Sequence, residues 1–192
     1  MQRGDERAGP MSVIERILRR DAEPPGDVVV ESMRRRDLRR GVMDIEADAY
    51  PRPWSQGVFT SELEQARRGT RHYLVARSGR EVVGYAGLWF TDGEAHVTNV
   101  AVKQSWRRQG VARRLLVALA EEARRRGCTA WTLEVRVSST GAQELYRTFG
   151  FVPAGIRKRY YENTEDAIVM WCHDIDGEEY GRRLEVLRDG RD

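Results

Sequence analysis

The chain has 192 residues, which is enough for one α/β domain with a full hydrophobic core and short for two. It carries 33 basic and 30 acidic residues, a formal net charge of +3, and only two of the basic residues are lysines. So small a charge excess does not by itself indicate a nucleic-acid-binding protein, and the arginine bias can equally reflect genome composition.

The spacing of cysteine and histidine argues against a disulfide framework or a zinc site. Cys128 and Cys172 are far apart and form no C-x-x-C motif, and the three histidines form no ligand-spaced set. Cys128 is expected to be a small buried residue, since no histidine is paired with it in a recognisable pattern. No stretch approaches the ~20 apolar residues of a membrane span, so a cytoplasmic protein without metal or membrane contacts is expected.

Both ends of the chain differ in composition from its middle. Residues 1–26 mix charge with proline and glycine and are interpreted as an extension, although "VIERILRR" could form a short amphipathic helix. Residues 176–192 are polar and charge-dense, which suggests a loosely attached tail. One domain is therefore expected over residues 27–175.

The first half of this domain alternates between strand and helix patterns. A strand is expected at 27–33, then a helix at 37–50 with Asp37 as its N-cap, then a helix over 57–68 capped by Ser55. Three apolar runs with short turns between them follow, and they favour an antiparallel meander of strands at 72–77, 81–90 and 95–102.

The second half contains the strongest helix pattern. Apolar residues repeat at helical spacing between Gly110 and Gly127, and they are Ala112, Leu115, Leu116, Leu119, Ala120 and Ala123. A strand at 131–137, a helix at 141–149 ended by Gly150, and strands at 151–161 and 166–175 should follow. The helix between Gly110 and Gly127 has a strand before it and a strand after it, and this order implies one parallel pair inside a mostly antiparallel sheet.

A basic turn precedes the strongest helix and has the pattern R-x-x-G-x-A from Arg107 to Ala112. Unpaired N–H groups at a helix start attract phosphate, and Gly110 would let the backbone approach closely. The pattern is neither a P-loop nor a dinucleotide fingerprint, and the alternative is a turn whose arginines are simply solvated.

One glutamate interrupts the apolar strand at 131–137. Side chains alternate across a strand, so Glu134 lies on the polar face, opposite Leu133 and Val135. The Glu134 side chain therefore faces either solvent beside Arg136 or a functional site. Tyr146 follows one loop and about two helical turns later, and it is either a helix residue packing against its neighbours or part of the same site.

These segments together resemble the GNAT acetyltransferase superfamily, and in particular its RimI-type branch, the ribosomal-protein-alanine N-acetyltransferases. The resemblance rests on "VAVKQSWRRQGVARRLL", "LEVRVSSTGAQELYRTFGF", "RYYENTEDAIVM" and "PWSQGVFTSEL", and it covers residues 27–175. It implies an α/β fold with a mixed, mostly antiparallel central sheet, a splayed parallel strand pair and flanking helices.

The resemblance also implies where acetyl-coenzyme A binds. The backbone of Val100, Ala101 and Val102 would contact the pantetheine arm, and the pyrophosphate would be wrapped by the backbone of Arg108, Gln109, Gly110, Val111, Ala112 and Arg113. Ser139 stands where the family commonly has an asparagine that contacts the coenzyme. Thr140 and Gln143 could form a capping box that secures the following helix.

By the same resemblance Glu134 is the general base and Tyr146 the general acid of direct attack by an amine on the thioester. An α-amino group has a pKa near ~8, so a carboxylate or a water relay can remove its proton without extreme tuning. The acceptor would be a protein N-terminus, such as the N-terminal alanine of a small-subunit ribosomal protein, and direct contact with nucleic acid is not required. The enzyme would be a monomer or weak homodimer.

Three aromatic residues are predicted to line the acceptor entrance, namely Trp54, Tyr160 and Tyr161, although ordinary surface or core packing explains them equally well. Arg157 and Arg159 could favour an acidic or RNA-bound partner, or simply protect a strand edge. Two other functions remain open. One is acetylation of lysine or a small-molecule amine, and the other is an acyl-coenzyme A sensor or basic RNA-associated domain without catalysis.

Overall fold

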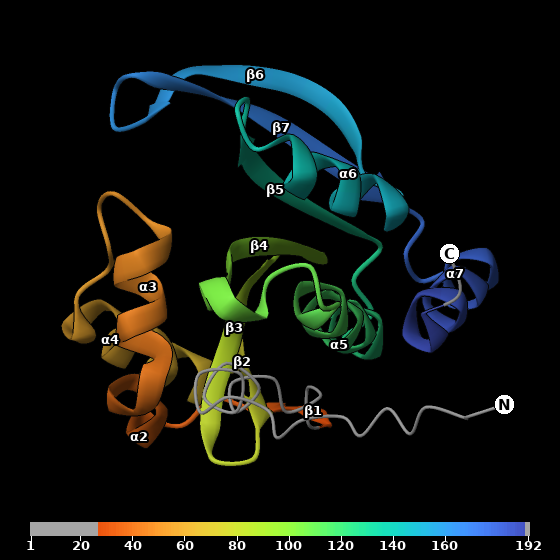
Figure 1. The fold of residues 1–192 in the computed structure, drawn as a ribbon. Coiled ribbons are helices and arrows are strands. Elements are labelled where there is room, and N and C mark those ends of the chain that lie inside the picture. The colour runs from red at the N-terminus through yellow and green to blue at the C-terminus, as the bar shows by residue number, and fades with distance from the viewer. Residues whose placement is uncertain (1–26, 191–192) are drawn as a thin grey trace, which may run out of the picture.

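The computed structural model describes residues 27–190, so the possible helix at "VIERILRR" lies outside the described residues. Its centre is a seven-stranded sheet with the order β1-β2-β3-β4-β5-β7-β6 (Figure 1). The strands are β1 (Val28–Ser32), β2 (Arg71–Ser78), β3 (Glu81–Thr91), β4 (Glu94–Val102), β5 (Ala130–Arg136), β6 (Val152–Tyr161) and β7 (Glu165–His173). The predicted β2, β3, β4 meander is confirmed.

The only parallel neighbours in this sheet are β4 and β5, and they are paired over a short length. Glu94–His96 lie opposite Ala130–Thr132, and beyond these residues no further pairing of the two strands is present in the described sheet. The ribbons of β4 and β5 diverge from that point (Figure 1). The predicted splayed parallel pair is therefore confirmed.

Helix α5 (Val111–Arg125) covers one face of the sheet, as its apolar stripe predicted. Its Leu115, Leu116 and Leu119 are fully buried, and across this core Trp131 packs against Phe151 with ring centroids 4.6 Å apart. Each buried side chain of this size contributes about 1.5–3 kcal/mol to stability. This core fixes α5 against the paired end of β5.

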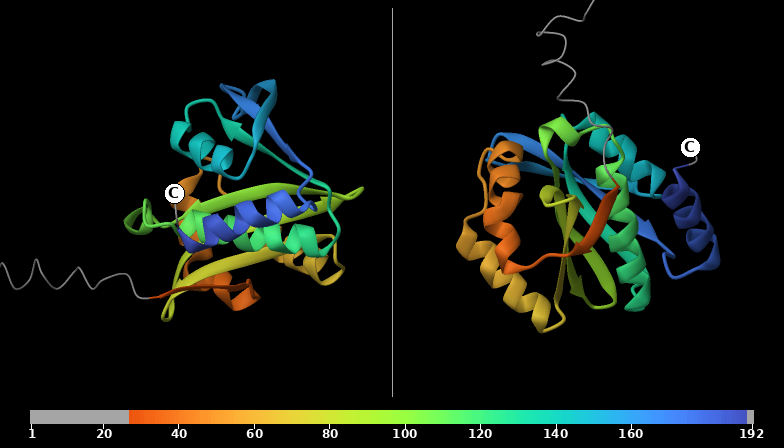
Figure 2. Two further views of the ribbon diagram at one scale, coloured as in Figure 1. Left: turned by 90° about the vertical axis from the view of Figure 1, so that its right-hand side faces the viewer. Right: turned by 60° about the horizontal axis from the view of Figure 1, so that its bottom comes forward.

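The opposite face is covered by α2 (Arg35–Asp37), η1 (Leu38–Val42), α3 (Met43–Ala49) and α4 (Gln56–Arg67), as the two views of Figure 2 show. The prediction of one helix capped by Asp37 is wrong. Asp37 lies inside α2, where its carboxylate accepts the N–H of Arg34 at 2.8 Å, and the chain kinks at Gly41 with φ +141°. A Cβ at Gly41 would lie 3.1 Å from that of Val82, so the close approach to β3 requires glycine.

The start of α4 follows the predicted chemistry. The side chain of Ser55 accepts a hydrogen bond from the backbone N–H of Val58 at 3.3 Å. Phe59, on the inner side of α4, is fully buried and contacts Trp54 and Tyr85 through its ring. This second core positions the loop between α3 and α4 beside the end of β4.

The C-terminal segment is not the loosely attached tail that its polarity predicted. Residues Glu178–Asp189 form α7, which packs beside α5 (Figure 2). Tyr180, Leu184 and Leu187 are buried there, and the guanidinium of Arg124 on α5 donates to the carbonyl of Gly177 at 2.8 Å. Three apolar residues at helical spacing therefore anchor one face of a segment that is otherwise charged. Across residues 27–190, none of the helices combines the length and apolar character needed to cross a bilayer.

Candidate active site

A cleft of about 1110 Å³ opens where β4 and β5 separate. It is walled by the free edges of both strands, the start of α5, α6 (Thr140–Thr148) and the end of α3. It brings together most of the predicted site residues, which are Val100, Ala101, Val102, Arg108, Gln109, Gly110, Val111, Ala112, Arg113, Glu134, Ser139, Tyr146 and Tyr161.

The start of α5 has the tight, glycine-containing turn from which the sequence predicted phosphate binding. Gly110 precedes the helix in the left-handed region with φ +77°, and Arg108 adopts φ +62° in the same turn. The N–H groups of the first helical turn and the positive end of the helix dipole therefore border the cleft. Such a turn can hold a pyrophosphate through its main chain, with arginine charge around it.

The loop from β5 to α6 borders the cleft, and its hydrogen bonds differ from those of the predicted capping box. Ser139 is the N-cap of α6 and makes no side-chain capping bond, whereas Thr140 is already the first helical residue. The amide of Gln143 donates instead to the carbonyls of Arg136 at 3.1 Å and Val137 at 2.9 Å. The predicted capping box is therefore wrong, and Gln143 ties α6 directly to the end of β5.

Glu134 occupies the wall of the cleft and is not solvated, since its side chain is only 7% exposed. Its carboxylate lies 3.1 Å from Nε2 of His96 and 3.0 Å from Nη1 of Arg157. The hydrogen bond from His96 and the positive charge of Arg157 hold the pKa of Glu134 below its usual value. Glu134 is therefore a carboxylate at neutral pH, with one partner on β4 and one on β6.

Tyr146 lies on the same cleft, on the inner side of α6. Its ring packs edge-on against Phe151 with centroids 5.8 Å apart, and burial raises its pKa to about 12. The phenol is therefore protonated at neutral pH and can donate its proton. A second phenol, Tyr50 at the end of α3, donates to the carbonyl of Val100 at 3.1 Å, and burial raises its pKa as well.

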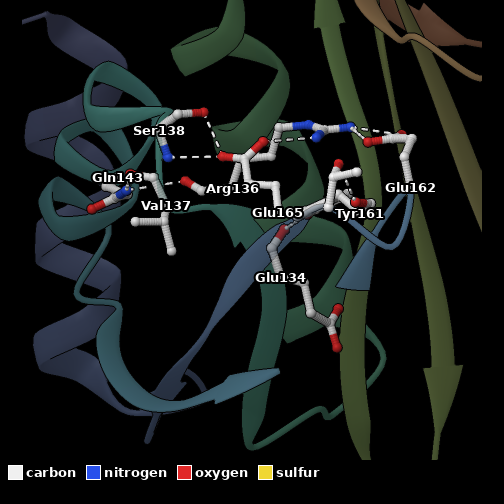
Figure 3. Close-up of polar contacts among 9 residues, drawn as sticks. Glu134, Arg136, Val137, Ser138, Gln143, Tyr161, Glu162 and Glu165 are labelled. Atoms are coloured by element: carbon white, nitrogen blue, oxygen red, sulfur yellow. Dashed lines mark hydrogen bonds and ion pairs between the residues drawn. The ribbon is translucent and has the colours of Figure 1, made fainter. Parts of the chain in front are cut away.

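Arg136 clamps the turn between β6 and β7 onto the end of β5 (Figure 3). Its guanidinium donates to Glu162 at 2.8 Å and to Glu165 at 2.9 Å, and it lies 4.1 Å from the centre of the Tyr161 ring. Tyr161 in turn donates its hydroxyl to the backbone carbonyl of Glu134 at 2.9 Å. Arg136 therefore bonds to the hairpin and not to the carboxylate of Glu134, which points away from it (Figure 3).

The remaining predicted residues lie elsewhere. Trp54 and Tyr160 are not among the residues that line the cleft. The Trp54 ring packs on Phe59 at 5.5 Å, and Tyr160 is 47% exposed beside the ring of Tyr161. Their role in acceptor binding stays a prediction. Cys128 is buried, as predicted.

Four side chains of this site were not predicted from the sequence to belong to it: Tyr50, His96, Asn99 and Arg157. The sequence suggests Arg157 only as a contact for a partner or as protection of a strand edge. His96 and Arg157 come from strands on either side of β5, so only the strand order brings them to Glu134. The alternation of β4 could have placed His96 on one face, but the sequence carries no signal for its register against β5.

Residues 39–151 match the model of the acetyltransferase (GNAT) family. A Bacillus subtilis relative is 38% identical over 143 residues, which covers 74% of this chain and 93% of the relative. The chain belongs to this family. It is an acyltransferase, and the predicted family and fold are confirmed.

Solved structures agree with this GNAT assignment. The ribosomal-protein-S18-alanine N-acetyltransferase of Escherichia coli superimposes with a TM-score of 0.69 at 31% identity, covering 77% of this chain and 94% of that one. A Salmonella typhimurium protein solved with its cofactor acetyl-CoA has the same fold, with a TM-score of 0.67 at 18% identity over 76% of this chain and 93% of that one. No group of metal-ligating side chains occurs in the part of this GNAT chain that the structure describes.

Proposed function

We propose that this GNAT protein transfers an acetyl group from acetyl-coenzyme A to the N-terminal α-amine of a protein, and that a ribosomal protein with N-terminal alanine is its acceptor. The observation that carries the proposal is the buried carboxylate of Glu134 and the protonated phenol of Tyr146 on one cleft. The acceptor class is supported by the E. coli protein, of which 94% aligns with this chain. A ribosomal acceptor would place the reaction in the cytoplasm.

The residues present fit acetyl-coenzyme A. The free edge of β4 offers backbone groups at Val100–Val102 to an extended pantetheine arm, and the start of α5 offers N–H groups to a pyrophosphate. Gly110 leaves this turn open, because among residues 27–190 a Cβ there would have only the guanidinium of Arg113 within 4 Å. Ser139 lines the same cleft and takes the place of the asparagine found in similar enzymes. When bound, the coenzyme supplies the thioester carbonyl that the amine attacks.

Glu134 accepts the proton of the acceptor amine. An α-amine of pKa near ~8 is about one-tenth neutral at pH 7, so an enzyme can bind this fraction without removing a proton first. Once the C–N bond forms, the nitrogen becomes positively charged and keeps both of its protons, one of which is now strongly acidic and must leave to give the neutral amide. A carboxylate with a lowered pKa is then a sufficient base, directly or through one water.

Tyr146 supplies the second proton, which goes to the sulfur as the C–S bond breaks. Its pKa of about 12 keeps the phenol protonated at neutral pH, so its proton is available to the sulfur while negative charge develops there. The products are the acetylated N-terminus and coenzyme A thiol, and the proton gained by Glu134 returns to Tyr146 through solvent. No acyl-enzyme is required, and we assign no role to Cys128, which is buried away from the cleft.

A panel of peptides tests the acceptor class. Peptides that begin with Ala, Ser or Met, an acetyl-blocked version of each, and a blocked peptide with an internal lysine are incubated with acetyl-coenzyme A and analysed by mass spectrometry. Ribosomal-protein N-terminal sequences beginning with alanine are expected to gain one acetyl group at the α-amine, and blocked peptides none. Acetylation of only the internal lysine would overturn the proposal, and binding of acetyl-coenzyme A without any transfer would favour a non-catalytic module.

A further inference from the structure

One buried amide on the cleft has an unused hydrogen-bond donor. Asn99 is 9% exposed, and it lines the cleft two residues from Ala101 on the free edge of β4. Of the buried side-chain nitrogen and oxygen atoms that lack a partner within residues 27–190, only Nδ2 of Asn99 belongs to a residue of the cleft wall. A buried, unsatisfied N–H destabilises the folded protein, so such a group in a cleft wall requires an explanation, and a ligand that accepts its hydrogen is one.

A β-bulge places Asn99 on the α3 and α4 side of the sheet. Gly87 of β3 is opposite Asn99, and Leu88 is opposite Val97, so Thr98 is the extra residue. Residues directly opposite each other share a face, and Gly87 faces the ring of Tyr73 in the core beneath α4. Asn99 therefore lies on the α3 and α4 side of the sheet, whereas α5 covers the other side.

A threonine hydroxyl holds the other end of this amide. Thr98 donates its single hydroxyl hydrogen to Oδ1 of Asn99 at 3.1 Å, and Tyr73 donates its own to Glu62 on α4 at 2.8 Å, so the two hydroxyl oxygens lie 3.2 Å apart without a hydrogen between them. Gly87 is needed for this contact, because a Cβ there would lie 2.7 Å from Oγ1 of Thr98. With Oδ1 occupied, Nδ2 is the atom left to bind a ligand.

We propose that Nδ2 of Asn99 donates to the first peptide carbonyl of the acceptor, and so selects an α-amine over a side-chain amine. This inference rests on the proposed function. In a peptide N-terminus the amine and this carbonyl are attached to the same Cα, so the oxygen lies about 3 Å from the nitrogen. A single N–H donor that binds this carbonyl therefore also fixes the position of the α-amine. A lysine ε-amine or a simple alkylamine has no carbonyl at this distance, so it leaves the donor unpaired.

A double-mutant cycle between enzyme and acceptor tests the proposal. The acceptors are an alanine-initiated peptide and its analogue in which an (E)-alkene replaces the first peptide bond, compared at a pH above both amine pKa values. The enzymes are wild type, Asn99→Leu and, as a matched amide-to-leucine control at an exposed position outside the cleft, Gln104→Leu. One neutral hydrogen bond is worth about tenfold, so wild type and the Gln104→Leu control should prefer the natural peptide by about tenfold in kcat/KM.

In Asn99→Leu this preference should disappear. Asn99→Asp, which has no N–H donor, should lose it too, and it serves if the leucine variant does not fold. Thr98→Val, which frees Oδ1, should reduce the preference by a smaller factor and identify Thr98 as a positioning residue. The affinity for coenzyme A, measured by calorimetry, should stay within about twofold in all of them.

Two results separate the possible failures. If wild type acetylates the peptide but Asn99→Leu keeps the tenfold preference, or loses activity equally on both acceptors, Asn99 does not recognise the carbonyl and this inference is overturned alone. If wild type acetylates neither acceptor at its N-terminus, the proposed function itself has failed.

Discussion

Replacing Glu134 by glutamine removes the proposed base with almost no change in shape. A general base contributes about 10²–10⁴ in rate, which corresponds to about 3–5 kcal/mol of activation free energy. Glutamine keeps one oxygen, so it can accept from either His96 or Arg157, but its amide nitrogen then faces the other donor. We therefore expect kcat for an alanine-initiated peptide to fall by at least 100-fold, within the range given for a general base.

The same substitution should cost stability by a smaller and separable amount. The contact with His96 is nearly buried and, as a charged hydrogen bond, is worth about 1.5–3 kcal/mol, whereas the Arg157 side chain is 55% exposed and its contribution is screened by solvent. A loss of about 1–3 kcal/mol in urea unfolding would leave most of the protein folded. Glu144 also lines the cleft, from an exposed position on α6, so Glu144→Gln removes the same charge and should change kcat by less than about threefold.

The assay follows release of the coenzyme A thiol with a thiol reagent, and mass spectrometry of the peptide confirms where the acetyl group is. Retention of more than one-tenth of wild-type kcat by folded Glu134→Gln would refute the assignment of this carboxylate as the base. Equal losses in the Glu134 and Glu144 variants would show that the cleft needs negative charge in general.

Three further predictions concern pH, the hairpin and the C-terminal helix. The pKa of Glu134 is lowered and that of Tyr146 is about 12, so neither group titrates near neutral pH. We therefore expect kcat/KM to rise with pH through the pKa of the acceptor amine and to stay level to about pH 10. If the midpoint of this rise stays the same for acceptors with different amine pKa values, the prediction is contradicted. Arg136→Gln frees the turn that positions Tyr161, so the KM for peptide should rise several-fold with a stability loss of about 1 kcal/mol in urea; unchanged peptide kinetics would show that the clamp is structural only. Leu184→Ala should lower the free energy of unfolding by about 2–5 kcal/mol, whereas a loss under about 0.5 kcal/mol would mean that α7 is not part of the folded core.

The elements with strong periodic patterns could be predicted from the sequence. The apolar stripe of α5 and the alternation of β5 follow from local geometry, because burial of one face requires 3.6-residue or two-residue spacing. Prediction failed where local chemistry competed with tertiary contacts. Asp37 reads as an N-cap, yet it lies within α2, beside the guanidinium of Arg77 at 2.5 Å, and the helix is interrupted because Gly41 packs against β3.

The C-terminal segment shows the same limit from the opposite direction. Its charge density predicted a loose tail, but Tyr180, Leu184 and Leu187 align on one face of α7 and find an apolar surface beside α5. Composition reports the average of a segment, whereas a helix can be anchored by one face alone. Only the position of that surface decides whether such a helix docks.

For the active site, three features could be inferred from the amino-acid sequence alone: the family, the polar face that carries Glu134, and the helix start that can bind phosphate. The neighbours of these groups depend on the folded arrangement, which places His96 and Arg157 at the carboxylate and Asn99 on the α3 and α4 side of the sheet. They depend on it because strand order, register and a single bulge bring together residues from β4, β5 and β6. None of these three properties is determined by the local periodicity of one segment.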